Sequence, residues 1–110
     1  MRLLCCALLA SALAMPVAAR VYQGQEAAAL RCANTMALTA VALDSVGRLG
    51  EDEKNVLLGI TVLILERHVG GTWSQKKEAM SIVRDRRALH ETLEDFERFA
   101  AQCIQQFPIN

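Results

Sequence analysis

The sequence has little net charge and few motifs that carry chemistry, and these shortages narrow the possible functions. Twelve lysines and arginines balance twelve aspartates and glutamates, so the formal charge at pH 7 is zero. Proteins that bind nucleic acid or anionic lipid through general attraction carry an excess of cations. No glycine-rich phosphate loop and no internal repeat is present. We therefore expect no nucleic-acid partner.

Only two of the four cysteines lie outside the N-terminal apolar segment, and the spacing of the cysteines disfavours most cysteine chemistry. Cys5 and Cys6 fall in the N-terminal apolar segment, which leaves Cys32 and Cys103 in the rest of the chain. Without a Cys-x-x-Cys motif, thiol redox chemistry, covalent haem attachment and a closely spaced zinc site are not expected. An isolated pair in an exported protein is most simply a disulfide. This disulfide would add roughly 4 kcal/mol to the free energy of unfolding in the loop-entropy model.

Residues 1–19 have the pattern of an export signal. Arg2 supplies a positive start, residues 3–15 are apolar, and small residues end the segment at Ala19. A permanent membrane anchor is the alternative, but this run is shorter than the roughly 20 residues that span a bilayer. We expect cleavage after Ala19, a single helical domain over 20–110, and a periplasmic or secreted location. We expect no stable membrane anchor after cleavage.

The longest uncharged run, 56–65, is predicted to form the centre of the fold. Acids at 51–53 precede it, and cations at 67–68 and glycines at 70–71 follow it. A helix dipole and a helix C-cap favour this arrangement. A buried strand is the competing interpretation, because short apolar runs do not separate the two by periodicity. The length and the charges favour a helix over 51–68, about 27 Å long.

Small residues predict close packing between helices. The segment 25–46 is predicted to be helical, with small and apolar residues spaced three and four apart on one face. These residues are Ala29, Ala33, Met36, Ala40 and Leu43. In the next helix Gly59 costs about 1 kcal/mol relative to alanine, and we expect a neighbouring backbone to approach it closely. The least apolar stripe of that helix is Asn55, Gly59, Val62 and Glu66.

The segment 74–107 contains no glycine or proline, so one long helix or two shorter ones are possible. Its first half carries the cations Lys76, Lys77, Arg84, Arg86 and Arg87. Its second half carries the acids Glu91, Glu94, Asp95 and Glu97. In a single helix the cations would lie near the N-terminus and the acids near the C-terminus, and the helix dipole disfavours both. With a break near 87–90, the arginines end one helix and the acids begin the next, and the dipole favours both groups. A capping box from Thr72 to Gln75 is predicted to start the third helix, with Ser74 as a competing cap.

The predicted disulfide also favours two helices in this segment. Its two alpha carbons must lie within about 7 Å of each other. In a bundle of four antiparallel helices, the start of the first helix lies beside the end of the fourth, so Cys32 meets Cys103. With three helices, Cys32 would face the wrong end of a helix roughly 50 Å long. The predicted fold is therefore all-α, a small four-helix antiparallel bundle with one Cys32–Cys103 disulfide.

The last helix carries the most regular apolar pattern in the chain. Its predicted inward seam consists of Leu89, Leu93, Phe96, Ala100, Cys103 and Phe107. These residues are spaced three and four apart, as in a helical bundle. Pro108 is predicted to end the helix.

Few residues suggest catalysis or cofactor binding. His90 and Glu94 stand one helical turn apart and could offer two metal ligands, but only His68 could add another imidazole. Met36 or Met80 with His90 could ligate haem, although methionines at this spacing usually fill a core. No serine or cysteine lies in a sharp glycine-flanked turn. We expect no catalytic residues, no bound metal and no cofactor.

We therefore predict a non-enzymatic interaction protein, such as an inhibitor, an immunity-type binder or a small chaperone. Its partner would be another exported protein or a second copy of itself. The central helix is apolar nearly all round, so either the other helices cover it unusually well or an apolar patch is left for a partner. Leu58 and Ile64 are the candidates for such a partner surface. The basic residues Lys76 and Lys77 are further candidates, although a solvated helix face is their simpler interpretation. The alternative function is a ligand or metal carrier that uses the bundle interior and His90 with Glu94.

Overall fold

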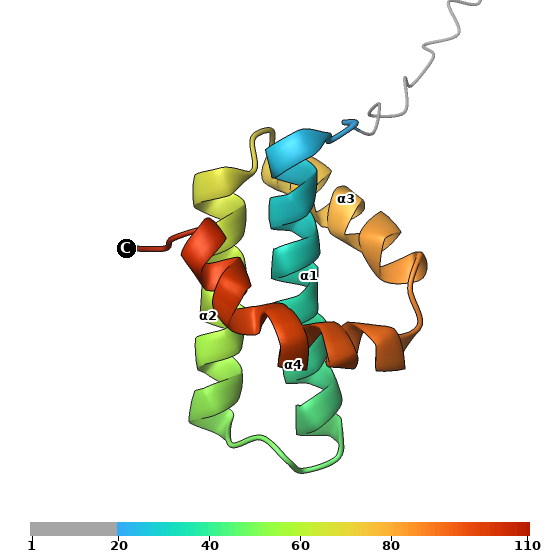
Figure 1. The fold of residues 1–110 in the computed structure, drawn as a ribbon, viewed down its shortest axis with the longest axis vertical. Coiled ribbons are helices and arrows are strands. Elements are labelled where there is room, and N and C mark those ends of the chain that lie inside the picture. The colour runs from blue at the N-terminus through green and yellow to red at the C-terminus, as the bar shows by residue number, and fades with distance from the viewer. Residues whose placement is uncertain (1–19) are drawn as a thin grey trace, which may run out of the picture.

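The computed structural model describes residues 20–110, and the predicted export signal at 1–19 lies outside the described residues. Four helices make up the fold: α1 (Gly24–Ser45), α2 (Glu51–His68), α3 (Trp73–Asp85) and α4 (Leu89–Gln106). No strand occurs between residues 20 and 110. The predicted all-α, four-helix fold is confirmed, and the observed helices begin and end close to the predicted positions (Figure 1).

The first helix, α1, is the element against which the other three pack. α2 and α3 lie on opposite sides of α1, and α4 crosses in front of it (Figure 1). The buried residues of α1 are Ala29, Leu30, Cys32, Ala33, Asn34, Met36, Thr39 and Ala40. Three of them are alanines, whose small side chains let neighbouring helices approach closely. The expectation that the apolar run 56–65 forms the centre of the fold is wrong, because α2 buries only Thr61, Ile64 and Leu65.

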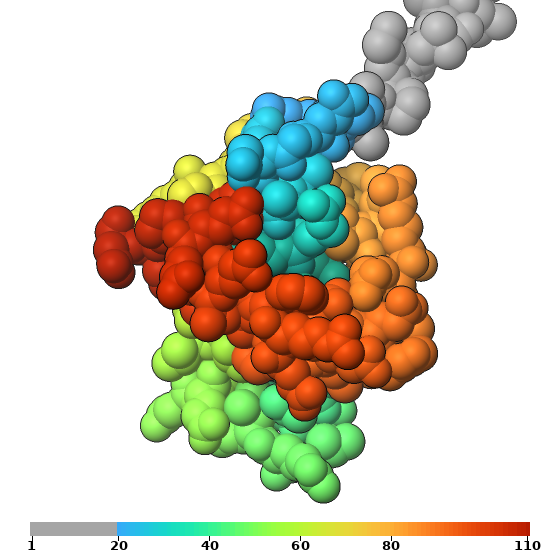
Figure 2. Space-filling model, in the orientation of Figure 1, coloured from blue at the N-terminus to red at the C-terminus, as the bar shows by residue number. Residues whose placement is uncertain are grey.

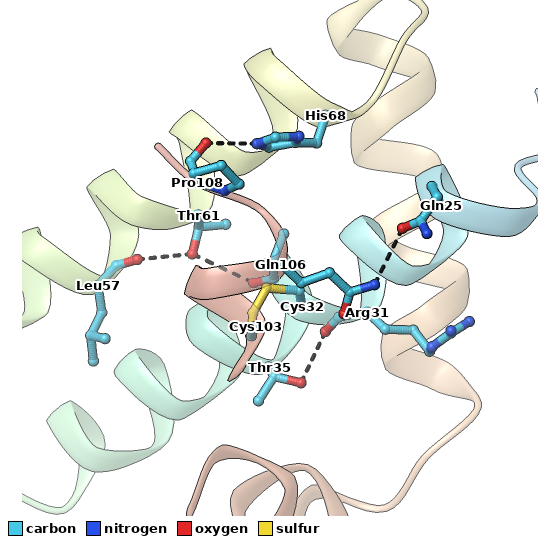
Figure 3. Close-up of a disulfide and its surroundings, with 11 residues drawn as sticks. Gln25, Arg31, Cys32, Thr35, Leu57, Thr61, His68, Cys103, Gln106 and Pro108 are labelled. Carbon is cyan, nitrogen blue, oxygen red and sulfur yellow. Dashed lines mark hydrogen bonds between the residues drawn. A yellow bond between two sulfur atoms is a disulfide. The ribbon is translucent and has the colours of Figure 1, made fainter. Parts of the chain in front are cut away.

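The disulfide joins α1 to α4 across the core, as Figure 3 shows. Cys32 and Cys103 are bonded, and their alpha carbons are 5.7 Å apart. A hydrogen bond of 3.2 Å from Gln106 Nε2 to Gln25 Oε1 lies near it and ties the same two helices together. The end of α4 thus lies beside the first half of α1, and the predicted pairing is confirmed.

The end of α4 is also held against α2. The ring of Phe107, which is buried in the core, meets the ring of His68 edge-on, with centroids 5.4 Å apart. His68 Nε2 lies 2.7 Å from the carbonyl oxygen of Pro108. His68 is therefore used in packing the C-terminal segment, and the basic end of α2 is partly covered there.

The connection between α2 and α3 is defined by a capping box. Thr72 Oγ1 accepts a 3.1 Å hydrogen bond from the Gln75 backbone N–H, and Gln75 Oε1 accepts a 2.9 Å bond from the Thr72 N–H. Gly71 precedes it with φ +89°, a conformation that glycine adopts without strain. The predicted capping box is confirmed, and Thr72 rather than Ser74 is the cap.

A sharp break separates α3 from α4, where the charge pattern predicts one. Arg87 lies in the break, and its guanidinium group is 2.9 Å from the Asp95 carboxylate and 3.7 Å from the Glu91 carboxylate. Glu91 Oε1 also accepts a hydrogen bond from the Ala88 backbone N–H, which is one of the free donors at the start of α4. Opposite charges thus meet at the junction, and α4 turns back across α1.

Candidate functional site

The structure places the four residues of the predicted partner surface in different environments. Ile64 is fully buried in the core, and Lys76 is only 9% exposed. Leu58 is half-buried on α2, and Lys77 is exposed on α3. The prediction that Ile64 and Lys76 lie on an exposed surface is therefore wrong, whereas Leu58 and Lys77 remain accessible.

Lys76 is buried because it completes the end of another helix. Its Nζ donates a 2.9 Å hydrogen bond to the carbonyl oxygen of Leu65 in the last turn of α2. The last four carbonyl groups of a helix have no partner within it, and a cation near them is favourable. The role of Lys76 in this structure is thus to join α3 to α2.

One side of α2 is uncovered and carries both apolar and polar residues. We call it the outward face of α2, and it consists of Asp52, Asn55, Val56, Gly59, Val62, Leu63 and Glu66. These residues are spaced three and four apart, so they share one side of the helix. Val56 is 60% exposed and Val62 is 39% exposed, while Ile64 on the opposite side packs against the core. The predicted stripe through Gly59 and Val62 lies on this face.

Gly59 lies at the centre of the outward face without a neighbour. A Cβ atom added at this position would meet nothing within 4 Å. The expected close approach by another helix of the same chain is therefore wrong. The cost of glycine inside a helix, about 1 kcal/mol relative to alanine, is not offset by packing within residues 20–110.

The outward face is accessible because the other helices gather around α1. α2 packs mainly against α1, whereas α3 lies on the far side of α1 (Figure 1). The end of the α1–α2 hairpin projects beyond α4 in the space-filling view (Figure 2). Most of the length of α2 is thus free to meet another molecule. This uncovered side contains the stripe Asn55, Gly59, Val62 and Glu66, which the sequence marks as the least apolar of the helix.

Among residues 20–110, cavities lie beside α1 where α3 and α4 pack against it, and two of them are described here. The larger has a volume of about 410 Å³ and is lined by the disulfide, by Asn34 and Thr92, and by Phe99. The Thr92 hydroxyl oxygen is buried and has no hydrogen-bond partner within residues 20–110. The volume falls in the range of small-molecule pockets. This cavity could therefore hold a small ligand with a hydrogen-bonding group.

The smaller cavity has a volume of about 290 Å³ and lies between the N-terminal segment, α1 and α3. Leu30 and Ile82 supply apolar lining, and Arg31, Arg86 and Arg87 also border it. Arg87 is paired with acids, as described above, whereas Arg31 forms no ion pair within residues 20–110. The two cavities share Arg31, Val83 and Arg87.

The residues considered for metal binding do not form a cluster in the described part of the chain. His90 and Glu94 both lie exposed at the start of α4. Among residues 20–110, no three His, Cys, Asp or Glu side chains are close enough to share a metal ion. His68 contacts Pro108 and Phe107 instead.

Within residues 20–110, no single helix combines the length and the apolar composition of a membrane span. Of the described helices, only α2 and α3 taken together meet those criteria, and they form an angle of 116°.

No protein-family model, curated protein or solved structure matches the chain.

Proposed function

We propose that this chain is an exported, non-enzymatic interaction protein that binds through the outward face of α2. Its partner is another exported protein or a second copy of itself, and its role is that of an inhibitor, an immunity-type binder or a small chaperone. The exposure of Val56, Gly59 and Val62 on one side of α2 carries the proposal. An apolar helix face bordered by polar residues is typical of a partner-binding surface.

Two further observations support the location and the absence of catalysis in this proposal. A disulfide is compatible with an oxidising, exported compartment, and residues 1–19 have the composition of an export signal. Cys32 and Cys103 are bonded to each other, so neither offers a free thiolate for nucleophilic catalysis.

Capture of partners with tagged protein from its own exported fraction tests the proposal. Val62→Asp places a charge in the outward face without disturbing the core, so we expect it to remove the captured partner while the protein stays folded. Val41→Asp is the control, because Val41 is the same residue type, is 57% exposed against 39% for Val62, and lies on α1. If both variants retain the same partners as the unmodified protein, the outward face is not the binding surface.

Ile64→Asp separates loss of folding from loss of binding. Ile64 is fully buried, so a charge there is expected to unfold the domain. Circular dichroism of the three variants distinguishes the effects. Folded Val62→Asp protein that lacks its partner supports the proposal, and an unfolded Val62→Asp protein would mean that this side of α2 is structural.

A second candidate function is a carrier of a small ligand. The specific observation is the unpaired Thr92 hydroxyl in the wall of the 410 Å³ cavity. Native mass spectrometry of protein purified from its own exported fraction would reveal a bound small molecule as added mass. A carrier that uses this cavity would lose that mass in the Thr92→Val variant, whereas Val62→Asp would retain it.

A further inference from the structure

We propose that the cavity between the N-terminal segment, α1 and α3 binds a small carboxylate whose apolar part lies in the cavity and whose charge meets Arg31 and Arg86. We call it the arginine cavity, and its volume is about 290 Å³. Thr92 and the outward face of α2 contribute no residue to its lining. Its occupation can therefore be tested separately from both functions proposed above.

The first support is the apolar wall of the arginine cavity. Leu30 of α1 and Ala79 of α3 belong to the core and reach this wall. Val21 and Ile82 also line it, and they are 77% and 37% exposed, so two large apolar side chains border the same space in contact with water. Covering them with the apolar part of a ligand would remove this surface from water, which is favourable. The lining thus predicts a ligand with an apolar body.

The second support is the excess of positive charge around the arginine cavity. Among residues 20–110, its lining contains no acid and the arginines Arg20, Arg31, Arg86 and Arg87. Arg20 lies 3.3 Å from the Glu26 carboxylate, and Arg87 lies 2.9 Å from that of Asp95. Arg31 and Arg86 form no ion pair within residues 20–110. Their charge is therefore available to an anion, and a guanidinium group binds a carboxylate through paired hydrogen bonds.

The two unpaired arginines approach the cavity from different elements. Arg31 lies on α1, and its side chain extends away from the Cys32–Cys103 disulfide (Figure 3). Arg86 lies at the C-terminal end of α3 as its C-cap residue. Because both line the arginine cavity, an anion held there would be attracted by a cation from α1 and by one from the end of α3.

The N-terminal wall of the arginine cavity is held in place before any ligand binds. The Tyr22 hydroxyl donates a 2.7 Å hydrogen bond to the carbonyl oxygen of Gly70, and the Arg20 guanidinium lies 4.8 Å from the centre of the Tyr22 ring. Glu26 pairs with Arg20 and also accepts a 2.6 Å hydrogen bond from the Gly70 N–H. A wall that is already fixed lowers the ordering cost of binding.

The volume of the arginine cavity limits the ligand to a small molecule. At about 30 Å³ for each water-sized group, it has room for roughly ten non-hydrogen atoms. A carboxylate of this size carries a short alkyl chain or a single aromatic ring. Octanoate is of this size and is therefore a suitable probe.

Titration of the exported protein with octanoate, followed by nuclear magnetic resonance, tests the site. Octanoate should shift the methyl signals of Leu30 and Ile82, and octanamide, which has the same chain without the charge, should bind at least about tenfold more weakly. Arg31→Gln and Arg86→Gln should each weaken octanoate binding by about tenfold and leave octanamide binding unchanged. Arg67→Gln is the matched control, because Arg67 is also exposed but lies on α2, outside the cavity.

Equal binding of octanoate and octanamide would overturn the assignment, because the arginines would then contribute nothing. Shifts at Phe99, which lines only the larger cavity, without shifts at Ile82 would also overturn it. The same holds if octanoate does not bind at concentrations on the order of millimolar. If the protein instead sediments with vesicles of anionic phospholipid through Arg31 and Arg86, these arginines contact a membrane surface and not a ligand in the cavity. Octanoate binding should be unchanged in Val62→Asp, so failure at the outward face of α2 and failure here are distinguishable.

Discussion

Lys76, near the start of α3, donates a 2.9 Å hydrogen bond through its ammonium group to the carbonyl oxygen of Leu65, in the last turn of α2. This contact joins two helices that meet at 116°. The Leu65 carbonyl is one of the four that α2 leaves without a partner. Because Lys76 satisfies it from the next helix, α3 can turn sharply away while Leu65 stays buried.

Replacement of Lys76 by alanine should destabilise the protein. It leaves the Leu65 carbonyl without this partner in a buried position, and hydrogen bonds to charged groups contribute about 1.5–3 kcal/mol. Lys77→Ala is the adjacent control, because Lys77 is exposed and should change the free energy of unfolding by less than about 0.5 kcal/mol. Urea unfolding of both variants measures the difference. Equal stabilities would show that the contact contributes little.

Thr92 and Thr61, two of the three threonines buried among residues 20–110, should respond in opposite directions to substitution by valine. Thr92 has a buried hydroxyl without a partner, so Thr92→Val removes an unsatisfied group and should be neutral or stabilising by about 1 kcal/mol. Thr61 donates a 2.9 Å hydrogen bond to the Leu57 carbonyl, so Thr61→Val should be destabilising by a similar amount. Thermal unfolding would compare them, and a strongly destabilised Thr92→Val would indicate a partner for its hydroxyl.

Replacing Gly59 and Gly71 by alanine should change the free energy of unfolding in opposite directions. Gly59→Ala adds a methyl group in open space inside a helix, so it should stabilise the monomer by about 1 kcal/mol. Gly71→Ala should be destabilising by about 1–3 kcal/mol, because Gly71 has φ +89° and an added Cβ would lie 2.6 Å from Gln75 Oε1. Unfolding should be measured at low protein concentration, where dimerisation does not contribute. Loss of stability in Gly59→Ala would show that position 59 is packed.

Removal of the disulfide should lower the free energy of unfolding by roughly 4 kcal/mol, because the bridge spans 71 residues of sequence. The double variant Cys32→Ala, Cys103→Ala and the reduced unmodified protein should both show this loss in urea unfolding. The double variant should be insensitive to reductant, which separates the bridge from other effects of reduction. An unchanged midpoint would show that helix packing alone maintains the fold.

The features that the sequence predicted follow from local rules. The capping box at Thr72 depends on residues three apart, and the break near Arg87 follows from the reversal of charge along 74–107. The pairing of Cys32 with Cys103 required one topological step, since only a fourth helix brings the chain back to the start of the first. Each of these rules involves residues close in sequence or a single pair of residues, so it can be applied before the packing of the helices is known.

The features that the sequence did not predict depend on how the helices pack together. Hydrophobicity indicated α2 as the centre, but the small residues of α1 let three helices approach it and leave one side of α2 open. Val62 lies in the least apolar stripe of α2 and Ile64 does not, but only the position of α1 determines that Ile64 is buried in the core and is not part of a partner surface. Lys76 was considered as a surface residue because its acceptor, the Leu65 carbonyl, lies on another helix and has no signature in the sequence.

Site-specific photo-crosslinking in the exported fraction tests most directly whether the outward face of α2 is a binding surface. A photoreactive residue at position 62 should give one dominant adduct, whose mass identifies a second copy of the chain or another protein. The same residue at position 41, on α1, should give little of that adduct. A dominant adduct at position 41 with none at position 62 would contradict the account.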